Sequence, residues 1–173
     1  RKISFIKILE PGGSRNSEKI RKLILNSKSD FNKNTDLLLY LAARSENINL
    51  IKKFYKKRII LIDRFVDSTI AYQHYGFGVN LLLIKSINHY LLKDFKIDLT
   101  FLNIVNRENM KKRLKLRKKL NRYDKFDFSF YNKVQKGFLK LAKNKKKYSI
   151  IDSNIDIKLN KEFIKNKIES LIR

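Results

Sequence analysis

The feature that most constrains the fold of this chain is a set of short apolar runs that end directly in polar residues. Residues 59–62 are followed by Asp63-Arg64, and residues 148–151 are followed by Asp152. Runs that are apolar at every position, rather than at alternate positions, are typical of a parallel sheet covered by helices on both faces. The sequence therefore predicts an α/β fold with a mainly parallel sheet.

Strands and helices are predicted to alternate along the whole chain. In such a sheet, ligands bind beyond the carboxyl ends of the strands, so Glu10, Asp63-Arg64 and Asp152 should converge on one edge. A length of 173 residues suits one domain with a real core, and we expect residues 1–173 to form it. The predicted strands are 3–9, 59–62, 99–105 and 148–151, and the predicted helices are 17–25, 35–55, 68–75, 81–92, 108–119, 128–143 and 157–172.

The chain is strongly basic, with a formal net charge of +25. Such a charge fits a nucleic-acid or membrane partner, but it fits small anionic substrates and a lysine-rich codon bias equally well. The lysines are scattered over every segment, and we therefore favour codon bias and expect no nucleic-acid partner. A hydrophobic content of 43% argues against a disordered polycation.

Several classes of protein are excluded or disfavoured by composition. The chain has no cysteine, which rules out disulfides, a thiolate nucleophile and cysteine-bound zinc. His74 and His89 have no partner at metal-ligand spacing, so we expect no metal held by the protein's side chains alone. No apolar run approaches membrane-spanning length, and we expect a cytoplasmic protein with no membrane partner.

Asp63-Arg64 is the strongest local signal for function. A guanidinium offers a planar fork of donors that matches phosphate oxygens, and the neighbouring aspartate could orient it or hold a metal through water. A structural ion pair at the end of a strand would look the same. The Glu10-Pro11-Gly12-Gly13 segment either lets a ligand approach the backbone or forms an ordinary turn.

Two further segments carry candidate binding groups. Tyr40 and Arg44 lie four residues apart on one helical face, which suits a base pocket, or else a core tyrosine beside a solvated arginine. The basic segment 111–125 could be a mobile lid over a transferring phosphate, or a solvated helix end. Hydrogen-bonding groups and a ring follow Asp63 closely at Ser68, Thr69, Tyr72 and Gln73.

Taken together and in order, these segments resemble the bacterial thymidylate kinase family. The resemblance implies a three-layer P-loop NTPase-like fold and transfer of the γ-phosphoryl group of ATP to dTMP with Mg²⁺. It also implies a homodimer. The matching stretches are EPGGSRNSEKIRKLIL, LLLYLAARSENI, LIDRFVDSTIAYQ, DLTFLNI, LNRYDKFDFSFYNKVQKGFLKLA and YSIID.

The resemblance also implies a role for each matching position. Tyr40 would lie against thymine and Arg44 would donate to a thymine carbonyl. Arg64 and Arg21 would hold the dTMP phosphate, and Asp63 would tune the arginine and metal region. The other substrate-binding positions would be Glu10, Ser68, Thr69, Tyr72 and Gln73, and the lid, about 115–127, would place Arg117 and Arg122 over the ATP phosphates.

The sequence departs from the family at its start. The family opens with a strand and a Gly-x-x-x-x-Gly-Lys-[ST] loop, and neither is present here. We therefore expect an N-terminally truncated kinase that is inactive alone, whereas the full-length product would be active. Leu9 and Asn121 replace a common arginine and a common lid aspartate. The alternatives are a basic nucleic-acid-binding module, a related nucleotide kinase and a non-catalytic relic.

Overall fold

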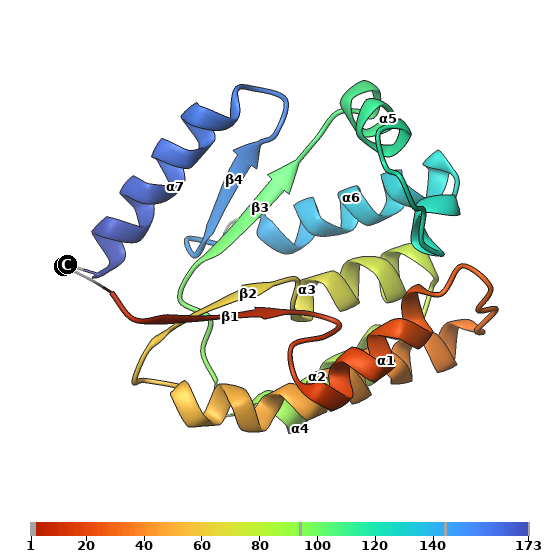
Figure 1. The fold of residues 1–173 in the computed structure, drawn as a ribbon, viewed down its shortest axis with the longest axis horizontal. Coiled ribbons are helices and arrows are strands. Elements are labelled where there is room, and N and C mark those ends of the chain that lie inside the picture. The colour runs from red at the N-terminus through yellow and green to blue at the C-terminus, as the bar shows by residue number, and fades with distance from the viewer. Residues whose placement is uncertain (1–2, 94, 144, 173) are drawn as a thin grey trace. The chain divides into compact units, whose positions relative to one another are not determined.

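The computed structural model describes residues 3–93, 95–143 and 145–172, in which strands and helices alternate (Figure 1). The described residues form two compact units. One contains the chain up to Phe95 and the segment Leu120–Leu141, and the other contains Lys96–Lys119 and the chain from Ala142 onward. Both units pair parallel strands and carry helices, which confirms the predicted α/β fold.

The first unit is built on the parallel pair β1 (Phe5–Leu9) and β2 (Ile59–Asp63). Leu9 lies opposite Asp63, and the next amide, that of Glu10, donates to the Asp63 carbonyl at 3.0 Å. The two strands therefore end together, as expected for the carboxyl edge of a parallel sheet. The helical segments of this unit are α1 (Arg15–Leu25), α2 (Lys33–Phe54), α3 (Val66–Thr69), the π-helical η1 (Ile70–Gly76), α4 (Leu81–Leu92), the 3₁₀ turn η2 (Tyr123–Lys125) and all but the last residue of α6 (Phe128–Ala142).

Side-chain caps set where the helices of the first unit begin. Ser14 accepts from the Ser17 amide at the start of α1, and Asn32 accepts from the amides of Asn34 and Thr35 at the start of α2. Such caps satisfy amides that have no partner within the helix. Because α2 begins at this cap, Asp36 falls in its first turn and lies buried.

The core of the first unit joins α2, η1 and α4. Its buried residues share aliphatic side chains; they are Leu37, Leu41, Ile70, Val79 and Ile84. A second cluster packs Ala71 of η1 against Phe130 and Val134 of α6. These contacts hold α2 and η1 firmly beside each other, so side chains from both elements can line one site.

The second unit is built on the parallel pair β3 (Thr100–Ile104) and β4 (Tyr148–Asp152), with α5 (Arg107–Lys115) and α7 (Ile157–Ile172). The helix predicted at 108–119 was too long, because α5 ends at Lys115. This helix buries none of its residues, and Leu116 is 82% exposed, so no packing continues the helix into the basic segment that follows. Among the described residues, no helix has both the length and the apolar character needed to span a membrane.

Candidate active site

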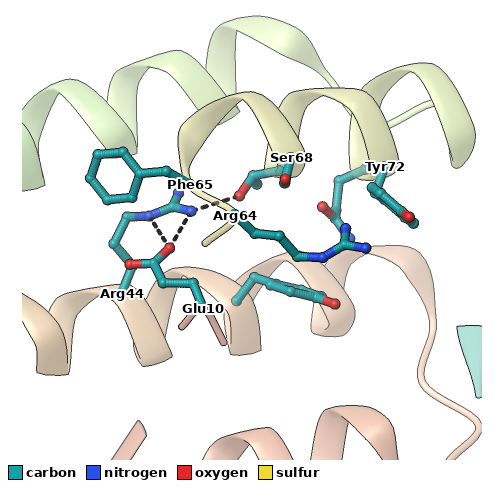
Figure 2. A pocket seen from close by; sticks show the side chains of 9 residues that line it. Glu10, Arg44, Arg64, Phe65, Ser68 and Tyr72 are labelled. Carbon is teal, nitrogen blue, oxygen red and sulfur yellow. Dashed lines mark hydrogen bonds and ion pairs between the residues drawn. The ribbon is translucent and has the colours of Figure 1, made fainter. Parts of the chain in front are cut away.

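A pocket lies where the ends of β1 and β2 meet α2 and the segment α3–η1 (Figure 2). Eight of the residues that line it were predicted as site residues from the sequence, and Phe65 was not. The structure brings these eight together from segments far apart in the chain: Glu10, Tyr40, Arg44, Arg64, Ser68, Thr69, Tyr72 and Gln73.

Arg44 is the most constrained side chain of the pocket. It is 1% exposed, and its guanidinium donates to Glu10 Oε2 from Nε at 2.9 Å and from Nη2 at 2.7 Å (Figure 2). Nη2 also donates to Thr69 Oγ1 at 3.0 Å, and Nη1 donates to Asn88 Oδ1 at 2.6 Å. The alternative of a solvated arginine is therefore wrong.

These bonds leave Arg44 with little freedom. A guanidinium has five N–H donors, and the four bonds use all of them except one on Nη1. Glu10 supplies the opposite charge that a buried cation requires. Its other oxygen, Oε1, is buried and finds no hydrogen-bond partner among the described residues. Arg44 is thus a preset donor and not a side chain that must move to act.

Asn88 of α4 is a member of this network that sequence reasoning missed. It is 5% exposed, and its amide nitrogen donates to the Ile84 carbonyl at 2.8 Å, which turns its oxygen toward Arg44. Nothing in the sequence around position 88 points to the pocket, because Asn88 lies 44 residues from Arg44. Only the packing of α4 against α2 brings the two together.

Arg64 stands at the turn that ends β2. Its backbone has φ of 63°, in the left-handed region that is uncommon for residues other than glycine. Local strain of this kind clusters at functional sites. The Arg64 guanidinium lies 5.2 Å from the centre of the Tyr72 ring (Figure 2), within the range of a cation–π contact. The side chain remains accessible to solvent, which suits a residue that would receive a ligand's phosphate.

The loop after β1 holds its own backbone with side chains. The amides of Gly12, Gly13 and Ser14 donate to Ser17 Oγ, Glu18 Oε1 and Asn47 Oδ1 at 3.0, 2.9 and 3.0 Å. The loop is therefore a braced turn that positions Glu10, and these three amides are not an open cradle for a ligand. Arg21 of α1 also braces it, because Nη1 donates to the Pro11 carbonyl at 2.6 Å.

A second buried network surrounds Asp36, which sequence reasoning also missed. Asp36 is 1% exposed, and its Oδ2 accepts from Gln73 Nε2 at 2.9 Å and from the Tyr123 hydroxyl at 2.5 Å. Its Oδ1 accepts from Arg122 Nη2. A signal was available, because Asp36 lies one helical turn before Tyr40 and therefore on the same face of α2.

Two tyrosines at this site, Tyr40 and Tyr123, stay neutral. Burial raises the pKa of Tyr123 above its ordinary value, and it also raises the pKa of Tyr40. Tyr123 lies edge-on to both Tyr40 and Tyr72, with ring centres 6.1 and 5.6 Å apart. The three rings form an apolar wall, and the hydroxyl groups of Tyr40 and Tyr123 remain hydrogen-bond donors near neutral pH.

The remaining predicted residues lie outside the pocket lining. Asp63 is exposed at the end of β2, next to Arg64. Arg122 contacts Asp36, and its guanidinium also lies 5.4 Å from the centre of the Phe31 ring. Arg117 belongs to the second unit, and its amide donates to the Leu114 carbonyl at 3.2 Å. Among the described residues, no three His, Asp or Glu side chains group as they would around a metal ion.

Comparisons with known proteins agree on one family. The family model for thymidylate kinase matches residues 2–164. The thymidylate kinase of Trichodesmium erythraeum is 36% identical over 168 residues, which are 94% of this chain and 73% of that protein. The enzyme of the same name from Mycoplasma capricolum is 38% identical over 154 residues, 86% of this chain and 72% of that protein.

The structural comparison gives the same result. The crystal structure of thymidylate kinase from Ehrlichia chaffeensis matches with a TM-score of 0.75 and 28% sequence identity. The match covers 95% of this chain and 80% of that one.

Proposed function

The chain belongs to the thymidylate kinase family, and we propose that it supplies the dTMP-binding part of an enzyme that transfers the γ-phosphoryl group of ATP to dTMP. The family consists of nucleoside monophosphate kinases with the P-loop NTPase fold, and the chain shares this fold. The observation that supports the acceptor site is the pocket itself. It presents the preset cationic donor Arg44 and two buried acceptors that have no partner among the described residues, Glu10 Oε1 and Gln73 Oε1, beside aromatic rings.

Arg44 and Gln73 together match the edge of a thymine ring. That edge offers a carbonyl oxygen, then the N3–H donor, then a second carbonyl oxygen. The remaining N–H of Arg44 suits a carbonyl, and Gln73 Oε1, which is buried and unpaired among the described residues, suits the N3–H. Tyr40 supplies a ring for stacking. Ser68, Thr69 and Tyr72 complete the base and sugar pocket in this proposal.

The phosphate of dTMP would bind at the strand edge, at Arg64. A guanidinium pairs with phosphate oxygens through two parallel hydrogen bonds, and Arg64 sits where β2 ends with its side chain open to solvent. Arg21 would add a second positive charge from α1, beside the loop that it braces. Asp63 is an exposed carboxylate next to Arg64, the kind of oxygen ligand that Mg²⁺ takes together with water.

ATP and Mg²⁺ are the co-substrate and cofactor in this proposal, and lid arginines would neutralise charge on the phosphates. Arg117 and Arg122 are the lid arginines of this proposal, and Arg122 also contacts Asp36. The sequence contains no Gly-x-x-x-x-Gly-Lys-[ST] loop, and we propose that turnover requires a segment that supplies one.

A cytoplasmic homodimer completes the proposal, and light scattering on the purified chain would report its oligomeric state.

The experiment that tests the acceptor site is a thermal-shift titration of the chain with dTMP, with UMP and single-stranded DNA for comparison. A ligand that binds only the folded state stabilises it, by about 2.7 kcal/mol at a hundredfold excess over Kd. We expect a saturable rise in Tm with dTMP. A rise with DNA that disappears at high salt, without any response to dTMP, would instead indicate a nucleic-acid-binding module.

A further inference from the structure

We infer that Asp36 is a positioning residue that orients the side-chain amide of Gln73, so that the pocket selects a pyrimidine with an N–H at ring position 3. This inference rests on the proposed function and adds a determinant of base specificity to it. Asp36 itself is not among the residues that line the pocket. It acts through Gln73, which does line it.

The first step is the donor and acceptor chemistry of the contact. An ionised carboxylate can only accept hydrogen bonds, whereas a glutamine amide presents an NH₂ group on one side and an oxygen on the other. Gln73 Nε2 lies 2.9 Å from Asp36 Oδ2, so the NH₂ group must face Asp36. The carbonyl oxygen of Gln73 is therefore turned away from Asp36.

The second step concerns that oxygen. Gln73 is 1% exposed, and its Oε1 has no hydrogen-bond partner among the residues that the structure describes. A buried polar atom without a partner costs free energy unless something else satisfies it. Because Gln73 lines the pocket, a donor on a bound base can supply the missing bond.

The third step explains why Asp36 keeps its orientation. Arg122 Nη2 donates to Oδ1, on the opposite side of the carboxylate from Gln73, and supplies a positive charge. The Tyr123 hydroxyl donates to Oδ2 at 2.5 Å. Arg122 and Tyr123, the first residue of η2, thus hold the Asp36 carboxylate as a charged acceptor. Base selection in the pocket is therefore linked to the chain segment that carries Arg122.

The consequence is a preference between closely similar bases. Thymine has a donor at N3, which pairs with Gln73 Oε1. In 5-methylcytosine the same ring nitrogen is an acceptor, so two acceptors would face each other in a buried site. The free energy of the mispairing at N3 alone corresponds to a preference of about 10- to 100-fold for thymine. The amine that replaces the carbonyl at position 4 faces no group that D36N changes, so its contribution cancels when the variant is compared with the wild type.

The D36N variant tests whether Asp36 orients Gln73. Arg122 bonds one oxygen of the Asp36 carboxylate and Gln73 bonds the other, so the orientation of the new amide can be predicted. Arg122 will keep the oxygen of the new amide, so its nitrogen will face Gln73. Gln73 must then rotate its amide and present NH₂ to the pocket. We expect the ratio of the Kd for 5-methyl-dCMP to the Kd for dTMP, measured by calorimetry, to fall at least about tenfold.

The D36N/Q73E double variant supplies a rescue that a purely structural role for Asp36 would not predict. A carboxylate at position 73 can accept from the new amide with one oxygen and from N3–H with the other. We expect the Kd ratio to return to within about threefold of the original. E46Q is the matched control, since Glu46 is an exposed acid of the same helix that accepts a hydrogen bond from Asn16, outside the pocket lining. The Kd ratio of E46Q should not change.

Each outcome decides the inference. A folded D36N variant with an unchanged ratio would overturn it, and so would a wild-type chain that binds dTMP and 5-methyl-dCMP equally, although the proposed function would then survive. A wild-type chain that binds neither nucleotide would overturn both. If D36N does not melt cooperatively, the same change is made in the Q73E background. It should then strengthen dTMP binding about tenfold, and unchanged or weaker binding would overturn the inference.

Discussion

Replacing Glu10 by glutamine should destabilise the protein strongly, because among the described residues Glu10 is the only acid that pairs with Arg44. Both side chains are buried, with 1% and 3% of their surface exposed. Leaving one member of a buried pair uncompensated costs about 3–5 kcal/mol. Asn88 and Thr69 remain as neutral acceptors and place the expected cost at the lower end, about 3 kcal/mol.

Urea denaturation measures this loss, and a double-mutant cycle assigns it to the pair. Replacing both residues, in an E10Q/R44M variant, removes the stranded charge, so the double variant should be more stable than E10Q alone. E162Q makes the same chemical change at an exposed position of α7 and should alter stability by less than about 0.5 kcal/mol. A cost for E10Q below about 1 kcal/mol, or strictly additive losses in the cycle, would refute the argument that the buried charge dominates.

Three further predictions follow from single contacts. Y40A should weaken dTMP binding by about 1–3 kcal/mol in calorimetry if the Tyr40 ring stacks on the base, and unchanged affinity would remove it from the site. N88A leaves the Arg44 Nη1 donor unpaired and should lower the free energy of unfolding by about 1–3 kcal/mol in urea. G13A should lower the free energy of unfolding more than G78A in the same assay. Both glycines have positive φ, but of the two only Gly13 would place a Cβ against other atoms, 3.0 Å from Ile8 Cγ2. Equal losses of stability would contradict this.

The alternation of strands and helices was visible in the sequence because it depends on local patterns. Residues 59–62 and 148–151 were predicted as strands, and the structure has β2 and β4 there, each one residue longer. The helix predicted at 81–92 is α4 without change. The π-helical turn Ile70–Gly76 was not predicted, since its backbone differs from an α-helix only in which carbonyl each amide reaches.

The site could be predicted in part. Eight of the predicted residues meet in one pocket, because strand ends and helical spacing identify an edge of the sheet and a face of a helix. Arg44 illustrates the limit of this reasoning. Its spacing from Tyr40 placed it on the correct face, but its burial against Glu10, 34 residues away, could not be read from either segment.

The sequence by itself determined the class of fold, the family and the segments that carry binding groups, since these follow from apolar patterns and from motifs that are contiguous in the chain. Only the tertiary structure decided which of those groups remain available to a ligand. Asp36 meets Gln73 across 37 residues and Tyr123 across 87, so its role depends on packing between α2, η1 and η2. A hydrogen bond forms over about 3 Å and in one orientation, and no local pattern encodes such a distance between remote residues.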